Sequence, residues 1–446
     1  MLSTPQPIRL LFLFLIALPL VGCNDSETDV ISDPGPEDNP STENVAPAEV
    51  KVDPDDSDAV DALVEGKFIL SKNDAGNVTS FSIASDTDIS ETFAHLAGTP
   101  NVEVATFSGP GITDKGLDVL SKLQNLKRLD FTDTAIGDET LKVAAELPKL
   151  EALFLRRTGV TDDGLAVLTS LTKLRAIDLR NSNITDAGLD HLAKIKTLVD
   201  IQLEKSKVTD DGVVKLNSLP LRGINLNYCT SVSNVSLDVF GAMPTLESVQ
   251  LDASKITDEG MPAFANLMKL KRLRIRDTDI TGEGFAHIAK LEKLARLNLR
   301  GTSLDDDALE IISSLPNVTF LDISECRLAS AEGIQKIGKL KGLTYLGLWE
   351  TKTNSESFKA FGELTELTEL NLKATSIDDE AVDVILQMQK LTNLNVAGTQ
   401  LSDDGFRKLG TLPKLKTLNV ANTSIGFDVI DELAEKEGLE VVEFEN

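Results

Sequence analysis

One pattern of leucines repeats along most of this 446-residue chain. Each unit has the form Leu-x-x-Leu-x-Leu, and nearly all intervals are 24 residues, with 23 before Leu221 and 25 before Leu246 and Leu343. The units begin at Val78, Val102, Leu126, Leu150, Leu174, Leu198, Leu221, Leu246, Leu270, Leu294, Val318, Leu343, Leu367, Leu391 and Leu415, with a last fragment at Leu439. No unit can bury its leucines alone, so the units must stack. The repeats therefore predict one solenoid, although length alone suggests about three domains.

The pattern of each unit predicts a strand, a turn and a helix. Positions 1, 4 and 6 alternate as in a strand with leucine on one face. Position 9 is usually Thr or Ser, whose side chain can bond to the turning backbone. Thr-Asp at positions 12 and 13 indicates a helix start, and Leu at 16, 19 and 22 forms a helical stripe. We expect parallel strands about 4.8 Å apart on the concave side and helices on the convex side.

The period and pattern over residues 78–446 resemble bacterial leucine-rich repeat proteins, as in the unit from Leu150 to Leu171. The Thr-Asp-x-Gly-Leu helix start is similar to repeats of large bacterial surface proteins and lipoproteins, and to the substrate-recognising repeats of eukaryotic F-box proteins. No F-box can be assigned near the N-terminus. The resemblance implies an α/β right-handed horseshoe of about 15 repeats that binds protein or glycan, but a fold does not name the ligand.

The first 23 residues are interpreted as a lipoprotein signal peptide. A weakly positive start precedes an uncharged apolar run at 10–21, which is too short to span a bilayer comfortably. The run ends in Leu20-Val21-Gly22-Cys23, which resembles the bacterial lipoprotein signal and implies a lipid on Cys23. An ordinary signal peptide with a chance Cys is the alternative. We expect an exported protein anchored to the cell or outer membrane and facing the periplasm or the cell surface.

Residues 24–58 are expected to form an acidic disordered linker. Thirteen acidic residues and one base lie between Asn24 and Ala62, and five prolines interrupt the segment. Such a composition cannot bury enough apolar surface to order itself, and charge repulsion extends it. Residues 59–77 are expected to cap the solenoid, with a hairpin turn at 73–77. The chain is expected to end in a last strand that begins at Leu439.

The composition excludes several classes of function. The 44 Lys and Arg against 71 Asp and Glu give a net charge of −27, so the chain lacks the basic face that nucleic acids require. No hydrolase, metalloprotease, phosphate-loop or dinucleotide motif occurs. We therefore expect no enzyme, no cofactor and no metal.

The histidines, cysteines and recurrent acids each have a structural interpretation. His95, His191 and His287 all occupy position 18 and lie four repeats apart, too far to share a metal. Cys229 and Cys326 replace Thr at position 9, are also four repeats apart, and are expected to be buried and unpaired. The Asp column at position 13 is interpreted as charge at helix starts, with weak cation binding as the alternative.

The concave face departs most from repetition. The side chains at positions 3, 5 and 7 should point to the solvent on this face. In four successive repeats they carry five Arg and three aromatic residues, one of which is the only Trp of the chain. The predicted ligand-binding residues are Arg272, Arg274, Arg276, Arg296, Arg300, Phe320, Tyr345 and Trp349. Arg with exposed aromatic rings is typical of interaction hot spots, and guanidinium groups bind carboxylate, sulfate or phosphate.

Two alternatives to this site stay open. Asp277, Asp322 and Glu350 lie close enough in the sequence pattern to pair with some of the arginines. A second, weaker basic group consists of Arg128, Arg156, Arg157, Arg175 and Arg180 with Phe154. The sequence favours a membrane-anchored protein that binds a protein or an anionic polymer on its concave face. The alternative is an architectural spacer or a self-associating envelope protein without a specific ligand.

Overall fold

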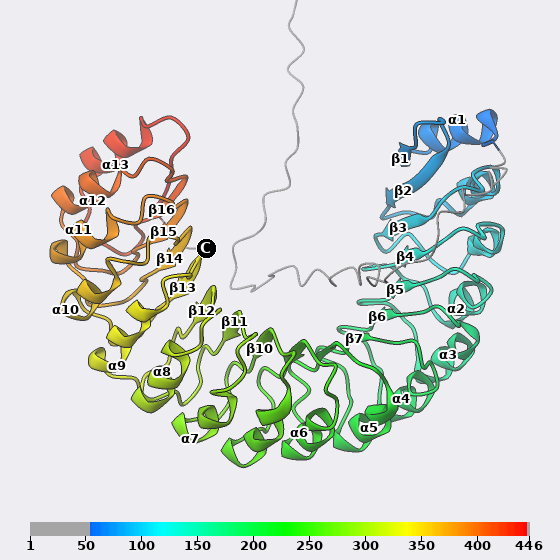
Figure 1. The fold of residues 1–446 in the computed structure, drawn as a ribbon. Coiled ribbons are helices and arrows are strands. Elements are labelled where there is room, and N and C mark those ends of the chain that lie inside the picture. Colours follow the sequence, from blue (N-terminus) through cyan, green and yellow to red (C-terminus); the bar gives the residue numbers. More distant parts are fainter. Residues whose placement is uncertain (1–53, 444–446) are drawn as a thin grey trace, which may run out of the picture.

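A computed structural model describes residues 54–443. Figure 1 shows an open horseshoe with strands along the inner rim and helices around the outer rim. One 17-stranded sheet follows the arc, and one hydrophobic core lies between the strands and the helices. The predicted α/β solenoid, with concave parallel strands and convex helices, is confirmed. The expected signal peptide, Cys23 and the linker up to residue 53 lie outside the described residues.

The strands are short and recur once per repeat. They are β1 (Ile69–Lys72), β2 (Val78–Ala84), β3 (Val104–Ser108), β4 (Arg128–Asp130), β5 (Ala152–Phe154), β6 (Ala176–Asp178), β7 (Asp200–Gln202), β8 (Gly223–Asn225), β9 (Ser248–Gln250), β10 (Arg272–Arg274), β11 (Arg296–Asn298), β12 (Phe320–Asp322), β13 (Tyr345–Gly347), β14 (Glu369–Asn371), β15 (Asn393–Asn395), β16 (Thr417–Asn419) and β17 (Glu440–Val442). The final strand confirms the expected C-terminal end of the sheet.

The convex side mixes α and 3₁₀ helices. The α-helices are α1 (Ser57–Glu65), α2 (Asp138–Ala144), α3 (Asp162–Leu165), α4 (Asp186–Leu192), α5 (Asp210–Lys215), α6 (Asn234–Gly241), α7 (Gly282–Phe285), α8 (Asp306–Ser313), α9 (Ala331–Gln335), α10 (Ser355–Phe358), α11 (Val382–Ile385), α12 (Asp403–Leu409) and α13 (Phe427–Ala434). The 3₁₀ helices are η1 (Ser90–Gly98), η2 (Leu117–Lys122), η3 (Ala166–Ser170), η4 (Leu216–Ser218), η5 (Asp258–Asn266), η6 (Ala286–Ile288), η7 (Lys336–Lys339), η8 (Lys359–Phe361) and η9 (Asp379–Ala381). Between residues 54 and 443, no helix has the length and apolar character needed to cross a bilayer.

The strands from β2 to β17 pair in parallel so that equal repeat positions face one another. Arg272 is opposite Arg296, Arg296 opposite Phe320, and Phe320 opposite Tyr345. Because this register holds along the sheet, each repeat position forms a continuous column on the concave face. Residues at the same position of successive repeats are therefore neighbours on the concave face, as the sequence analysis assumed.

The N-terminal cap begins earlier than expected. The hairpin of β1 and β2 is confirmed, since these strands pair antiparallel. However, α1 starts at Ser57, and the Asp56 carboxylate accepts hydrogen bonds from the amides of Asp58 and Ala59. Asp55 accepts a hydrogen bond from the Asn101 amide. The predicted linker end at residue 58 is therefore wrong, because these acids cap the helix and bind the first repeats.

The Asp column at position 13 joins most repeats to the next, a role that the sequence analysis missed. Asp186 accepts a hydrogen bond from the backbone N–H of Thr209 at 2.8 Å and another from its hydroxyl at 2.7 Å. The same contact to a Thr or Ser of the next repeat occurs at Asp138–Thr161, Asp162–Thr185, Asp210–Ser233, Asp258–Thr281, Asp306–Ser330 and Asp379–Ser402. We call these contacts the inter-repeat bonds.

The glycine of Thr-Asp-x-Gly makes room for this bond. A Cβ on Gly212 would lie 2.3 Å from Oδ1 of Asp186, the acid of the preceding repeat. Thr209 also accepts a hydrogen bond from the Asp211 N–H, so it caps its own helix as expected. Thr and Gly of one motif thus contact the Asp of the preceding repeat, and the Asp of the same motif contacts the repeat that follows.

The turn after each strand requires a left-handed backbone conformation at position 8. This residue has positive φ in almost every repeat, although most of them are not glycine. Gly398 supplies this conformation at φ 65°, whereas Ala374 adopts it at φ 52°. A left-handed conformation costs an ordinary L-residue about 1–2 kcal/mol, and asparagine or glycine less.

We predict that Asp186→Ala lowers the free energy of unfolding by about 1–3 kcal/mol, because the half-buried Thr209 loses the acceptor of its N–H and its hydroxyl. Asp186→Asn should cost less, since Asn234 holds Thr257 with both atoms of its amide. Urea unfolding followed by circular dichroism measures both changes. Asp211→Ala is the matched control, because the Asp211 side chain is exposed. Equal losses for the alanine variants at 186 and 211 would contradict the role of the inter-repeat bonds.

We also predict that Ala374→Gly raises the free energy of unfolding by about 0.5–1 kcal/mol. Relief of the left-handed strain exceeds the extra entropy of glycine in the unfolded chain. The control is Ala286→Gly, at an exposed helical position with φ −53°, which should lower stability by a similar amount. Thermal unfolding of both variants checks the opposite signs, and a loss of stability at Ala374 would refute this account of the turn.

Candidate functional site

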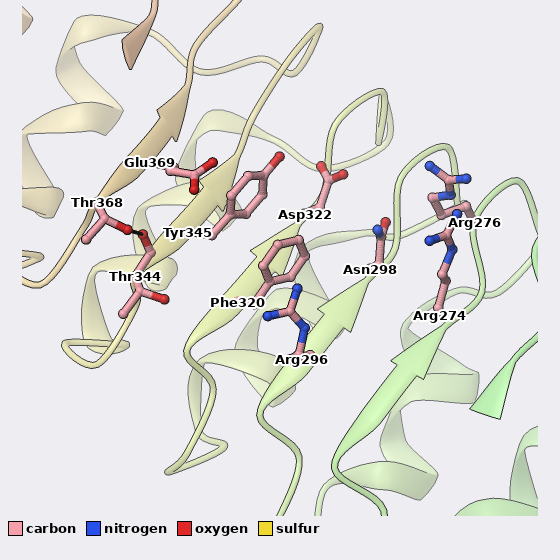
Figure 2. A pocket seen from close by; sticks show the side chains of 10 residues that line it. All are labelled: Arg274, Arg276, Arg296, Asn298, Phe320, Asp322, Thr344, Tyr345, Thr368 and Glu369. Atoms are coloured by element: carbon pink, nitrogen blue, oxygen red, sulfur yellow. Dashed lines mark hydrogen bonds between the residues drawn. The ribbon is translucent and has the colours of Figure 1, made fainter. Parts of the chain in front are cut away.

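The predicted residues gather on the concave face between β10 and β14. Five of them, Arg274, Arg276, Arg296, Phe320 and Tyr345, line a shallow pocket of about 370 Å³. Side chains on and next to the strands from β10 to β14 line it, and Figure 2 shows them: Arg274, Arg276, Arg296, Asn298, Phe320, Asp322, Thr344, Tyr345, Thr368 and Glu369. Arg272 is half-buried in the same row, in register with Arg296. The sequence therefore located the patch, and the structure shows how its members are held.

Arg296, Phe320 and Tyr345 form one stack across three strands. The guanidinium carbon of Arg296 lies 4.1 Å from the centre of the Phe320 ring. The Phe320 and Tyr345 rings are 4.1 Å apart and inclined by only 10°. Both faces of Phe320 are thus covered, and its exposed fraction is 7%. The expectation that the Phe320 ring is exposed is wrong, because Arg296 and Tyr345 of the neighbouring strands cover it.

Trp349 lies between two cations. The Arg300 guanidinium is 4.4 Å from the Trp349 ring, and the Lys373 ammonium is 5.0 Å from it. Arg300 also donates to Glu325 at 2.7 Å. Lys373 was missed in the sequence analysis, although it occupies the same repeat position as Trp349 one repeat later. We call these three residues the tryptophan sandwich, and the Arg296–Phe320–Tyr345 group the arginine–aromatic stack.

Arg274 and Arg276 are buried structural residues rather than exposed anion clamps. Their exposed fractions are 6% and 4%. Each donates from Nε to Oδ2 of Asp252, at 2.6 and 2.7 Å, and Asp252 is fully buried on the preceding strand's side of the patch. A buried charge requires such pairing. The predicted roles of Arg274 and Arg276 are therefore corrected: they pair with Asp252, which sequence reasoning did not consider.

Asp322 is the second buried carboxyl group of the patch. It accepts a hydrogen bond from the Ser324 N–H at 3.0 Å. Burial raises the pKa of this carboxyl, and the bond to Ser324 and the charges of Arg300 and Arg276 only partly oppose the rise. Gly347 on the next strand leaves space for it, because a Cβ there would lie 2.4 Å from Oδ1 of Asp322.

The second basic group is also internally paired. Arg157 and Arg156 contact Asp133, and Arg180 pairs with the buried Asp178 at 2.8 Å. Arg128 lies 3.9 Å above the Phe154 ring. Three of the five arginines in this group are therefore paired with nearby carboxylates.

Cys229 and Cys326, the two cysteines among residues 54–443, are buried and unpaired, as expected. The Cys326 thiol donates to the Leu299 carbonyl at 3.2 Å in the preceding repeat, and Cys229 contacts Leu203 in the same way. Burial raises the pKa of Cys326 to about 12, which disfavours the thiolate. Both lie in 25-residue repeats, where one extra residue lengthens the turn. Residues 54–443 contain no cluster of His, Cys, Asp and Glu able to hold a metal.

Comparisons with known proteins agree with this architecture. A family model described as "Leucine-rich repeat region" matches residues 302–445, and one described as "Leucine Rich repeat" matches 122–142 and 170–193. No curated protein matches the sequence. The protein is a leucine-rich repeat solenoid, and the comparisons find no catalytic family.

Solved structures support the same fold. An internalin from Listeria monocytogenes is similar with a TM-score of 0.53 and 20% identity, over 82% of this chain and 94% of that chain. A chain of the yeast Rad7 and Elc1 complex has a TM-score of 0.51 and 15% identity, over 75% of this chain and 84% of its own. At such identities the likeness establishes the fold alone.

We predict that the stability gained by Asp322→Asn grows with pH. Asparagine can accept the Ser324 N–H, as Asn371 does from Lys373 at 3.0 Å, but it does not titrate. The folded-state pKa of Asp322 is raised, so its contribution is most favourable at low pH and is lost as pH rises from about 3.9 through the folded-state value. Urea unfolding at pH 3.5 and pH 7 compares both proteins. A stability difference between the two proteins that does not change with pH would show that folding does not raise the pKa of Asp322.

Proposed function

We propose that this protein is a lipid-anchored, non-enzymatic protein of the bacterial envelope that binds a partner protein at β10–β14. The signal-like segment ending at Cys23 supports export and anchoring. The observation that carries the binding proposal is the pair of preformed cation–aromatic groups, the arginine–aromatic stack and the tryptophan sandwich. Side chains held in place before binding lose little entropy on binding, and Trp, Tyr and Arg dominate binding energies at protein interfaces.

A protein partner fits the patch better than a uniform anionic polymer. Carboxylates are interleaved with the cations: Asp252 and Glu325 pair with arginines, and the exposed Glu369 lines the pocket beside Tyr345. A polymer that carries only negative charge would approach these groups unfavourably, whereas a protein surface supplies both charges and apolar contacts. The similar yeast chain comes from a structure solved as a complex of Rad7 and Elc1, which is in keeping with a protein partner.

We predict that Trp349→Ala combined with Lys373→Glu abolishes capture of the partner. The test exposes the tagged full chain to envelope extract with a crosslinker and compares captured proteins. The control combines Lys194→Glu with Lys290→Glu, two exposed residues of the helical side. The double change at the patch should reduce recovery at least tenfold, and the control should leave it unchanged.

Two results would contradict the proposal. A partner retained by both folded variants would place binding away from the patch. No partner for any folded protein would favour the architectural spacer or the self-associating envelope protein instead. Circular dichroism of each variant verifies that it is folded.

A further inference from the structure

Large apolar side chains are rarely exposed in the part of the chain that the structure describes. Between residues 54 and 443 there are seven: Val64, Ile69, Val214, Val235, Met268, Leu328 and Phe427. The first two and the last lie in the terminal elements α1, β1 and α13, and Val214 and Val235 lie on the helical side in α5 and α6. The other two, Met268 and Leu328, flank the strands of the patch.

Leu328 is exposed because its repeat carries one extra residue. Cys326 and Ala329 are fully buried, whereas Leu328 between them is 61% exposed. The other 25-residue repeat has Thr230 and Ser231 at the same point, and both are exposed. The insertion therefore tolerates polar residues, so the fold itself does not require a leucine here.

Hydrogen bonds place Leu328 beside the tryptophan sandwich. The Glu325 N–H donates to the Trp349 carbonyl at 2.7 Å, and the Arg327 guanidinium donates to Glu350 at 2.8 Å. These bonds align the two turns in which the residues lie. Leu328 consequently lies at the edge of the surface that includes Trp349.

Met268 lies on the opposite side of the patch. It comes four residues before β10, whereas Leu328 follows β12, and the strands run in parallel. The Met268 side chain is 53% exposed. At the same place, two residues before the next unit, the following repeats have Glu292, Pro316 and Lys341. Met268 is thus an apolar exception at this edge, and a flexible thioether side chain adapts readily to a partner.

The surface between Met268 and Leu328 carries charges of both signs. Three carboxylates, Asp277, Glu325 and Glu350, occupy the turns after β10, β12 and β13, beside the arginines of the patch. Charged groups of both signs give an interface its specificity more than its affinity. Burial of apolar surface supplies favourable free energy on association, and Met268 and Leu328 provide such surface at the two edges.

We propose that the partner is a folded protein whose convex surface covers the patch and contacts Met268 and Leu328 at the same time. This inference rests on the binding function proposed above. Neither residue lines the pocket, so a ligand confined to the pocket would contact neither of them. The partner must therefore reach across the whole width of the concave face.

The separation of the two residues suits a folded domain. Positions 1 to 7 of a repeat span about 20 Å, and β10 and β12 are about 10 Å apart. A domain of about 100 residues has a radius of gyration of about 13 Å, so its surface is wide enough to contact both edges. An interface of standard size covers about 800 Å² of each partner, which extends well beyond one pocket.

Hydroxyl-radical footprinting of the purified complex tests these contacts. The probe is the protein recovered in the capture experiment, identified by mass spectrometry and mixed with the full chain. Oxidation of Met268 and Leu328 should fall at least threefold in the complex, together with that of Trp349. Val235 and Phe427 are exposed controls in the same sample, and their oxidation should not change.

Affinity provides a second readout. Met268→Gln combined with Leu328→Ser should weaken binding at least tenfold, because both changes remove apolar contact surface at exposed positions. The matched control combines Val214→Ser with Val235→Ser, which removes two exposed apolar side chains from the helical side and should leave the affinity unchanged. Urea unfolding verifies that both variants are folded.

The outcomes separate this inference from the proposed function. Protection of Trp349 without protection of both Met268 and Leu328, or an unchanged affinity of the double variant, would overturn the inference and leave binding at the patch intact. A tryptic digest of the partner that protects both residues as well as the intact partner does would refute the need for a folded partner. The absence of any partner, or binding that protects none of the three residues, would overturn both proposals.

Discussion

The whole architecture depends on the hydrogen bonds by which Asp at position 13 holds the helix start of the next repeat. A solenoid is stable only through contacts between neighbouring units. Leucine packing supplies most of the favourable free energy but has no direction, whereas the contact of Asp186 with Thr209 fixes one repeat relative to the next. Gly212 in the same motif completes it, because a larger residue would displace the acid. The concave columns exist because this geometry is repeated.

Between Asp114 and Asp403 the row of acids is broken within the repeats that form the patch. Gly282 follows β10 and Ala331 follows β12, at the place where other repeats carry the bonding acid. On the opposite side of the same repeats, Arg296 packs on Phe320 and Phe320 on Tyr345. The Phe320–Tyr345 contact joins β12 to β13 on the concave face, at the step where Ala331 makes no outer bond. The aromatic pair therefore contributes to the cohesion of the solenoid.

The sequence predicted the fold and the membership of the columns because both follow from a fixed period. It did not predict which acid pairs with which arginine. Asp252 and Asp322 are both one strand from an arginine, and only the side-chain conformations show that Asp252 holds Arg274. The burial of Phe320 was missed for the same reason, since stacking depends on ring orientation. The start of α1 was missed because an acid that caps a helix and an acid of a linker look alike in composition.

The patch combines two ways of fixing a cation, and this difference determines what each cation can do. The arginines bonded to buried Asp252 are structural residues of the pocket wall. Breaking these pairs would leave a buried charge without a partner, so the arginines stay fixed. Arg296 and Lys373 instead lie over ring faces, and the attraction between ring and cation fixes where their positive charge is presented.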